Sequence, residues 1–358
     1  METLKVITLC SGYDSQCLAL ERLKSIYPVF DYELVAWSEF DPESKIPLRK
    51  QPAVVAHNAL FPQWSERNLG DMTKIDWNNL NIQCDLLFYS TPCQSISVAG
   101  LQHGFAEGSG TRSSIIWNVR DAVIALKPKY LCLENVEAMV GEKFIGMFNL
   151  WQRELERLGY RNFAQLMNAK DYGVPQNRER IFLVSIRVDD ENNMPKYFFP
   201  REIKLKKRLK DLLEQNVDEK FYLNKEKESF FKQDGENFVD LKKVGTIYLG
   251  YVSSQETKHQ QDRVFDINGC SPTISSKETQ GRYLIKLDNG IRKLTQRECF
   301  RLMDVDDKDI DKIEASGISK TSQYQIAGNS IVVSCLYHIF RKMFIEKENE
   351  SQQLSFDF

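Results

Sequence analysis

The sequence predicts a doubly wound α/β fold, in which helices cover both faces of a mostly parallel sheet. Over residues 4–186, short runs rich in Val, Ile, Leu and Phe alternate with longer amphipathic stretches, which is the pattern of strands followed by helices. The chain has 358 residues, 42% of them apolar and 27% charged, so it can bury a full core and has room for about two domains. Such sheets bind ligands beyond the carboxyl ends of their strands, so the residues after each strand are the first candidates for a site.

The expected elements of this sheet come in order along the chain. Apolar runs predict strands at 5–9, 32–37, 86–89, 130–133 and 181–186. Apolar residues at intervals of three and four predict helices at 15–26, 114–126 and 144–158. A strongly apolar helix is expected at 331–344, before a polar tail, and it must pack against another part of the protein.

The composition changes after Ile186. The segment 189–195 is polar and ends in proline, and 201–210 is dense in Lys and Arg. From there to about residue 311, one expected helix at 209–215 is followed by short strands interrupted by Gly, Asn and Ser. The expected domains are a larger α/β domain at 1–187 plus 320–358 and a smaller, irregular, mostly-β domain at 188–319.

Composition and charge argue against several classes of protein. A formal net charge of −2 and a pI near 6.2 are not those of a protein that coats polyanions, so any contact with nucleic acid must be local. No run approaches the roughly 18 apolar residues of a membrane-spanning helix, and the first residues lack a secretory signal pattern. We therefore expect a cytoplasmic protein with no membrane partner.

The cysteines predict neither a metal centre nor disulfides. They stand at positions 10, 17, 84, 93, 132, 270, 299 and 335, without a C-x-x-C pair. The four histidines do not lie near them at the spacing of metal ligands.

Cys93 is nevertheless the most informative residue. It follows the expected strand that ends at Tyr89, where this architecture places its site. Pro92 fixes its own φ and restricts Thr91, so the thiol would be presented from a stiff loop. A single cysteine in an intracellular protein is far more often a small buried residue than a nucleophile, so its neighbours must decide.

Those neighbours are a carboxylate and two guanidinium groups. Glu134 directly follows the expected strand at 130–133, and Arg178 and Arg180 lead into the strand at 181–186. When each residue is considered alone, the simplest interpretation of Glu134 is a solvent-exposed residue at a strand end, and that of the two arginines is a pair of surface ion-pair partners. A thiol, a carboxylate and two guanidiniums in one cleft can instead attack an electrophilic ring carbon while donors neutralise the charge on the ring.

At this point the sequence resembles the DNA cytosine-C5 methyltransferases. Thr91-Pro92-Cys93-Gln94 resembles the Pro-Cys-Gln loop of that family, and Glu134-Asn135-Val136 its Glu-Asn-Val element. The further similar segments, in the order of the family, are 97–100 with Gly104-Phe105, 171–180 with its Gln-x-Arg-x-Arg element, 292–303 and 325–330. The resemblance implies a Rossmann-like, S-adenosylmethionine-dependent methyltransferase domain with a target-recognition domain at 188–319.

The resemblance also assigns roles. Cys93 would add to C6 of a cytosine flipped out of the duplex, and Glu134 would bind N3 and the exocyclic amine. Arg180 would hold the cytosine O2, Arg178 would order the loop and backbone, and 95–112 would form a mobile cover. The residues expected to contact DNA are Gln94, Ser95, Ser97, Gln176, Arg263 and Thr273.

The cofactor implied is S-adenosyl-L-methionine. The family's Phe-x-Gly-x-Gly appears as Cys10-Ser11-Gly12-Tyr13-Asp14, which keeps only the first glycine. Glu39 follows the second strand, where such folds bind ribose hydroxyls, and Asp71 stands where the family reads the adenine amino group. The residues expected to bind the cofactor are Cys10, Ser11, Gly12, Tyr13, Asp14, Ser15, Glu39, Phe40, Asp71, Met72, Ser90, Pro92, Ile115, Asn329 and Ser330.

Three other functions each fit part of the sequence. An RNA cytosine methyltransferase could use the same scaffold, but a separate recognition segment is what a reader of duplex DNA needs. A catalytically idle DNA-binding relative would not need Cys93, Glu134 and Arg180. A nicotinamide-dependent oxidoreductase lacks support because no G-x-G-x-x-G run follows the first strand. The expected partners are double-stranded DNA and a cognate restriction endonuclease, in bacteria or phage, with the protein acting as a monomer.

Overall fold

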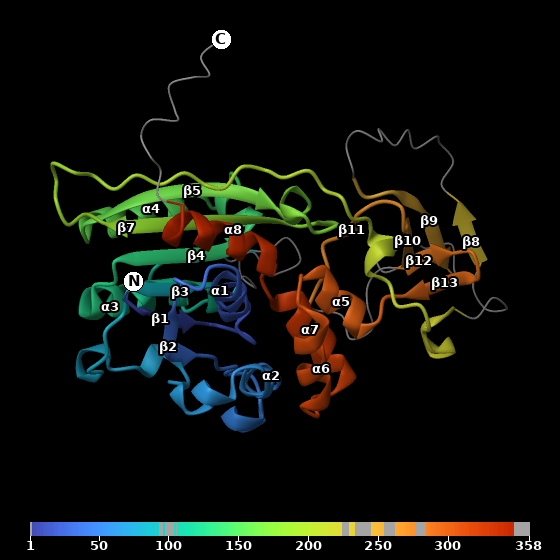
Figure 1. The fold of residues 1–358 in the computed structure, drawn as a ribbon, viewed down its shortest axis with the longest axis horizontal. Coiled ribbons are helices and arrows are strands. Elements are labelled where there is room, and N and C mark those ends of the chain that lie inside the picture. The colour runs from blue at the N-terminus through green and yellow to red at the C-terminus, as the bar shows by residue number, and fades with distance from the viewer. Residues whose placement is uncertain are drawn as a thin grey trace, which may run out of the picture.

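Two sheets joined through a group of helices make up the molecule, as a computed structural model shows (Figure 1). The structure describes residues 2–92, 96, 104, 106–223, 229–232, 245–253, 262–276 and 284–346. Within these ranges, no helix is both long enough and apolar enough to cross a membrane.

The larger sheet has the strand order β2-β1-β3-β4-β7-β5. Its strands are β1 (Leu4–Leu9), β2 (Tyr32–Ser38), β3 (Leu86–Tyr89), β4 (Tyr130–Val136), β5 (Tyr160–Asn168) and β7 (Glu179–Arg187). The first four strands in that order are parallel, whereas β7 runs antiparallel to β4 and β5 antiparallel to β7. The carboxyl ends of β1, β2, β3 and β4 therefore meet at one edge.

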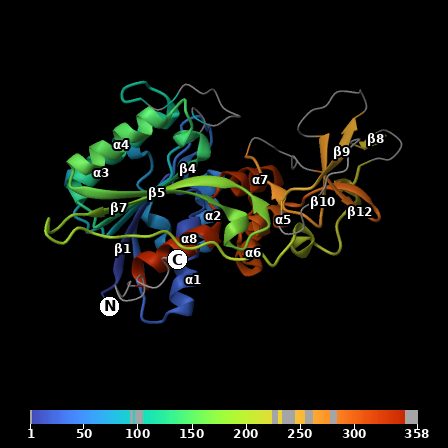
Figure 2. The same ribbon diagram turned by 90° about the horizontal axis from the view of Figure 1, so that it is seen from above.

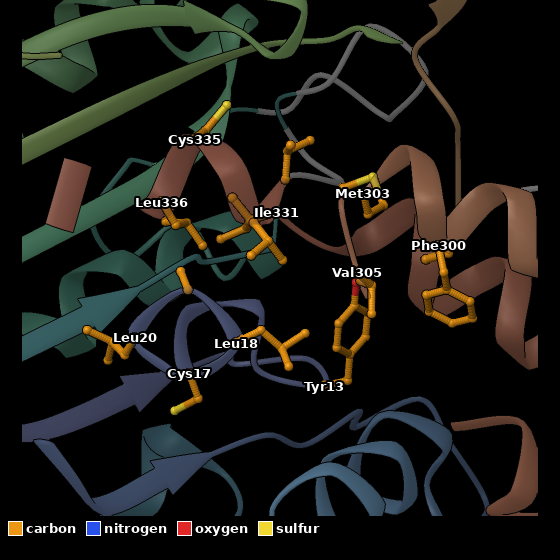
Figure 3. Packing of buried hydrophobic residues seen from close by; sticks show 14 of the residues in the cluster. Tyr13, Cys17, Leu18, Leu20, Phe300, Met303, Val305, Ile331, Cys335 and Leu336 are labelled. Atoms are coloured by element: carbon orange, nitrogen blue, oxygen red, sulfur yellow. The ribbon is translucent and has the colours of Figure 1, made fainter. Parts of the chain in front are cut away.

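Helices cover both faces of this sheet (Figure 2). One face carries α1 (Ser15–Ile26) and α8 (Val333–Phe344), and the other carries α3 (Ile116–Leu126) and α4 (Ile145–Arg157). Figure 3 shows Leu18 and Leu20 of α1 close to Leu336 of α8 in the shared core. The prediction that the terminal apolar helix packs onto the protein is confirmed.

The smaller sheet has the order β13-β12-β10-β9-β8. Its strands are β8 (Ser229–Lys232), β9 (Tyr248–Ser253), β10 (Arg263–Asp266), β12 (Leu284–Leu287) and β13 (Gly290–Lys293). They close around a small apolar cluster of Val252, Val264 and Leu284. Two short strands, β6 (Gln176–Asn177) and β11 (Ser271–Pro272), pair in parallel and link the two parts of the molecule.

Between the sheets lie α5 (Gln296–Leu302), α6 (Asp307–Ala315) and α7 (Lys320–Asn329), and α2 (Pro52–Leu60) packs against α6 and α7. The remaining regular segments are 3-10 turns. They are Leu48–Lys50, Pro62–Arg67, Met72–Lys74, Trp77–Asn79, Arg112–Ile115, Glu137–Val140, Ala169–Tyr172, Leu209–Leu212 and Glu219–Phe221.

The predicted elements agree with the structure where the pattern is strong. The strand at 86–89 and the helix at 15–26 have the predicted bounds. The helix predicted at 209–215 is wrong, because it is a single 3-10 turn that ends where Leu213 becomes extended. Glu134 and Asn135 belong to β4 itself rather than following it, because β4 continues its pairing with β7 to Val136.

Candidate active site

Three neighbouring strands bring Ser90, Glu134 and Arg180 together. Ser90 follows β3, Glu134 lies near the end of β4, and Arg180 lies near the start of the antiparallel β7, opposite Val136. The Ser90 hydroxyl donates to Glu134 Oε2 at 2.7 Å, and Arg180 Nε lies 3.2 Å from Glu134 Oε1. Glu134 is only 5% exposed. Each oxygen of a buried carboxylate thus has its own polar partner, which is what burial of the charge requires.

The backbone before Cys93 is tied to the same strand ends. Asn135 Nδ2 donates to the Thr91 carbonyl at 3.0 Å, and the Ser113 hydroxyl donates to the Pro92 carbonyl. Thr91 is buried and Pro92 is half-buried. Cys93 itself and the expected DNA contacts Gln94, Ser95 and Ser97 lie outside the described residues, as does most of the expected cover at 95–112.

Arg178 is buried rather than open to a substrate. It is 3% exposed, and its guanidinium donates to the carbonyls of Ile274 at 3.0 Å, Gly328 at 3.0 Å and Ser330 at 2.8 Å. These carbonyls belong to the segment leaving β11 and to the turn between α7 and α8. Arg178 therefore orders backbone from two distant parts of the chain around β6 and β7.

The loop after β1 carries a run of left-handed backbone. Cys10 has φ 52°, Gly12 φ 60° and Asp14 φ 70°. The Gly12 N–H donates to Glu39 Oε2 at 2.8 Å. This places the carboxylate that follows β2 against the loop that follows β1, at the carboxyl edge of the sheet.

Asn68 holds the next segment against Glu39. Its side-chain oxygen accepts from the N–H of Glu39 at 3.3 Å and of Gly70 at 2.9 Å. Asp71 follows, and its carboxylate accepts from the N–H and hydroxyl of Thr73. Partial burial alone would raise the pKa of Asp71, but these bonds and the Lys74 ammonium keep that pKa below its ordinary value. Asn68 is not among the residues predicted for the site, although Asn-x-Gly is a turn signal.

The Glu134 carboxylate, the backbone before Cys93 and the altered glycine loop after β1 can now be compared with known proteins. A family model described as C-5 cytosine-specific DNA methylase matches residues 4–345. The chain belongs to this family. It is a DNA (cytosine-5-)-methyltransferase, and the resemblance in the sequence is confirmed.

Relatives of this methyltransferase occur in bacteria and phage. The type II methyltransferase M2.ScrFI of Lactococcus lactis subsp. cremoris is 38% identical over 279 residues, which cover 78% of this chain and 71% of that protein. The orphan methyltransferase M.SssI of Spiroplasma monobiae is 31% identical over 295 residues, covering 81% of this chain and 73% of that one. The solved Dnmt2 methyltransferase of S. pombe is 17% identical, has a TM-score of 0.64 and covers 94% of this chain and 97% of its own, which shows a shared fold.

The other residues expected to bind the methyltransferase's cofactor lie around the two loops. Tyr13 is buried, its hydroxyl donates to Ser330 Oγ at 2.8 Å, and burial raises its pKa to about 12. Cys10 Sγ lies 3.5 Å from Met72 Sδ. Of the rest, Ser11 and Ser15 are buried, Phe40 and Ile115 are half-buried, and Asn329 is exposed at the end of α7.

Of the remaining residues expected to contact DNA, Gln176 is used inside the protein. It is fully buried, its amide N–H donates to the Leu302 carbonyl at 2.7 Å, and its oxygen accepts from the Ile274 N–H at 3.1 Å. A base contact by Gln176 would require these bonds to be given up. Arg263 is exposed at the start of β10, and the exposed Thr273 hydroxyl donates to the Asn177 carbonyl at 2.7 Å.

Gly328 marks a close approach between α7 and the segment after β11. A Cβ placed on Gly328 would lie 2.5 Å from the backbone of both Ser275 and Ser276, closer than real Cβ atoms come to backbone. Because Arg178 binds the carbonyls of Ile274 and Gly328, the same segment is held on two sides. We call this contact, made by Arg178, Ile274, Ser275, Ser276 and Gly328, the interdomain joint.

Beside Arg180 a second carboxyl group is perturbed. Loss of solvent and the neighbouring Glu179 carboxylate raise the pKa of Glu137, while the Arg180 guanidinium lowers it. Among the described residues, no group of His, Cys, Asp and Glu side chains is arranged to hold a metal ion. The Arg180 guanidinium interacts with two carboxyl groups, those of Glu134 and Glu137.

Proposed function

We propose that this methyltransferase transfers the methyl group of S-adenosylmethionine to C5 of a flipped-out cytosine within a specific sequence of double-stranded DNA, through a covalent bond between Cys93 and C6. The observation that carries the proposal is the arrangement of Glu134. Its carboxylate is held by Ser90 and Arg180 next to the backbone that leads into Cys93. A flipped base bound there would meet the thiol on its C6 side and the carboxylate on its N3 side.

The residues at the strand ends fit S-adenosylmethionine. A Cβ at Gly12 would meet no atom within 4 Å, so the backbone of this loop faces open space. The buried Ser11 hydroxyl oxygen makes no hydrogen bond within the described part of the chain. Glu39 would bind ribose hydroxyls, and Asp71 would bind the adenine amino group. S-adenosylmethionine supplies the methyl group as an electrophile.

The protein's own groups supply the remaining chemistry. An ordinary thiol, with a pKa of about 8.5, is only a few per cent ionised at neutral pH, so Cys93 must lose its proton before the attack. Its thiolate adds to C6, and Glu134 gives a proton to N3, which leaves an enamine whose C5 is nucleophilic. Once C5 is methylated, a water molecule takes the C5 proton, the electron pair of that C–H bond expels the Cys93 thiolate, and N3 returns its proton to Glu134. Arg180 would hold O2 as charge builds on the ring.

The smaller sheet is proposed to read the DNA sequence. Residues 188–319 would form the target-recognition domain, with the exposed Arg263 at the start of β10 and the half-buried Thr273 after β11 as DNA contacts, and residues 1–187 plus 320–358 the catalytic domain. Base-specific reading in the major groove needs donors and acceptors of this kind. A monomer is sufficient to flip one base, and a restriction endonuclease that cuts the same sequence is the proposed genetic partner.

Trapping on 5-fluorocytosine tests the mechanism. Fluorine cannot leave C5 as a proton does, so DNA with 5-fluorocytosine at the target should become covalently attached to the protein when S-adenosylmethionine is present. The Cys93→Ala variant should bind the same DNA but form no adduct and transfer no methyl group. Substantial residual transfer by Cys93→Ala would refute the nucleophile.

The target itself is found by methylation-sensitive sequencing of DNA from cells that express the protein. A single short sequence motif methylated at cytosine C5 is the expected result. Methylated cytosine in RNA with none in DNA would overturn the proposed substrate.

A further inference from the structure

Asp14 stands where the family has its second glycine, and its backbone adopts the glycine conformation. With φ 70° and ψ 60° it is left-handed, a region that glycine enters freely and that aspartate tolerates better than most residues. Its side chain is 0% exposed. Asp14 therefore cannot touch a ligand bound in front of the loop, so any effect it has on the cofactor must be indirect.

The buried carboxylate binds two neighbouring elements. Asp14 Oδ2 accepts from the Thr8 hydroxyl at 2.8 Å, on β1, and Oδ1 accepts from the Cys17 N–H at 3.3 Å, in the first turn of α1. The second bond caps the helix and places a negative charge at its positive end. Asp14 thus fixes the strand and the helix that the loop connects.

The third neighbour is His57 of α2. Its Nε2 lies 3.5 Å from Asp14 Oδ2, and both side chains are fully buried. Within the described ranges this nitrogen makes no hydrogen bond of its own, so the carboxylate is the group that it faces. The imidazole stacks on Trp37 of β2 with ring centroids 3.6 Å apart, and Trp37 Nε1 donates to the Trp64 carbonyl at 2.9 Å. The stacking on Trp37 therefore fixes the position of the His57 ring.

We propose that Asp14 is a positioning residue for cofactor binding, and that the buried pair Asp14–His57 does in this chain what a glycine does in the family's loop. The pair fixes the loop so that the Gly12 N–H points at Glu39, and it makes α2 part of the cofactor-binding machinery. This rests on the proposed function, in which Gly12 and Glu39 hold S-adenosylmethionine.

The physical reason is the difference between permitting a conformation and imposing it. A glycine at position 14 would permit the left-handed loop but would also leave it free to adopt others, which costs entropy when the loop is ordered. A buried carboxylate has strong preferences, because every orientation that loses Thr8, Cys17 or His57 leaves a charge without a partner in the core. Asp14 thus pre-organises the loop before the cofactor arrives.

The test compares binding of S-adenosylmethionine by full-length variants, measured by calorimetry well below their melting temperatures. Asp14→Gly restores the family's glycine, Asp14→Asn keeps the shape and the helix cap but removes the charge, and His57→Leu removes the imidazole. Each should raise the Kd for S-adenosylmethionine about tenfold, the effect of about one charge-assisted hydrogen bond, while kcat at saturating cofactor stays within about twofold. A general loss of structure would instead weaken cofactor binding and lower kcat together.

The matched control is His338→Leu, which removes a second buried histidine, in α8, that is remote from the loop. It should lower the melting temperature and leave the Kd for S-adenosylmethionine within about twofold. Wild-type affinity in Asp14→Gly would overturn the proposal, because the backbone alone would then suffice. An equal rise in Kd for His57→Leu and His338→Leu would also overturn it. Failure of the wild-type protein to bind S-adenosylmethionine would instead overturn the proposed function together with this inference.

Discussion

Two regions at the same edge of the large sheet are built in opposite ways. After β3, near the end of β4 and at the start of β7, the polar atoms of Ser90, Glu134 and Arg180 meet one another. After β1, the carboxylate of Asp14 is turned into the core, and a Cβ placed on Gly12 of this loop would meet no atom within 4 Å. In the proposed function, the first region acts through side chains and the second through backbone N–H groups.

This difference explains why one region matches the family closely and the other does not. A side chain that donates a proton or binds the ring has few substitutes, so the proposed roles of Glu134 and Arg180 require these residue types. A backbone conformation can be reached by more than one sequence, because the left-handed geometry at position 14 is open to glycine without strain and to aspartate with compensating bonds. Residue types shared with the family therefore indicate the proposed catalytic groups, whereas the proposed cofactor loop needs a backbone conformation rather than a particular residue at position 14.

The largest expected effect comes from Glu134→Gln at the rim. Gln keeps the shape and can still accept from Ser90, but it cannot give up a proton to N3. We expect kcat to fall about 1,000-fold, within the range of general acid catalysis, with the Kd for S-adenosylmethionine unchanged. Single-turnover methylation and calorimetry measure the two quantities. Glu142→Gln, at an exposed position after the same strand, is the control. A raised Kd for S-adenosylmethionine in Glu134→Gln would contradict the proposed division of roles between the Glu134 region and the loop after β1.

Glu39→Gln should show the opposite split. The carboxylate accepts from the Gly12 N–H and is proposed to bind the ribose, and a hydrogen bond to a charged group is worth about 1.5–3 kcal/mol. The Kd for S-adenosylmethionine should rise about 10- to 100-fold, and kcat at saturation should change little. Glu33→Gln, within β2 and paired with Lys5 and Arg67, should leave both values unchanged. A loss in kcat alone would contradict the assignment of Glu39.

Ser90→Ala sharpens the comparison, because the resemblance places Ser90 with the cofactor and the structure places its hydroxyl on Glu134. If orienting Glu134 is its role, Ser90→Ala lowers kcat about three- to tenfold at constant KM for S-adenosylmethionine, because Arg180 still pairs with the carboxylate. Ser90→Thr keeps the hydroxyl and should restore kcat. A rise in KM for the cofactor at constant kcat would return Ser90 to the cofactor side.

A separate effect, on stability rather than on activity, concerns the buried His338. Burial, helped by the Arg341 guanidinium, lowers the pKa of His338 to about 4. The native state therefore holds the imidazole neutral, and its contribution to stability is complete above the unfolded pKa of about 6.5 and is lost as pH falls toward 4. At pH 5 the loss is about 2 kcal/mol. Urea unfolding at pH 5 and pH 7 should differ less in His338→Leu than in the wild type; an unchanged difference would contradict this.

The sequence predicted those parts of the fold whose pattern matches their burial. The strand β3 is apolar on both sides because helices cover both faces of the sheet at that point, so its bounds could be read directly. The edge strand β5 was not predicted, because polar Arg161 and Asn162 follow one another and the apolar Ala164 and Leu166 are exposed, so no regular alternation marks a strand. The antiparallel direction of β7 was also missed, since strand direction depends on the chain's path rather than on composition.

For the site, the sequence predicted which residues matter better than where they point. Glu134 and Arg180 face each other, as their roles require. Gln176 and Arg178 belong to the same motif, yet both turn into the core, and no local pattern distinguishes them from Arg180. His57 could not have been selected, because its importance arises only when α2 folds against the loop after β1.

The interdomain joint has a consequence for engineering new specificities. Exchanging the sheet that is proposed to read DNA for that of a relative means cutting the chain on both sides of it. At Gly328 there is no room for even a methyl group against Ser275 and Ser276, and the Arg178 guanidinium donates a hydrogen bond to the Ile274 carbonyl. A graft that retains residues 271–276 from the host, and replaces only what lies beyond them, keeps the contacts that these residues make with Arg178 and Gly328. The foreign sheet would then be attached to the host through the native joint.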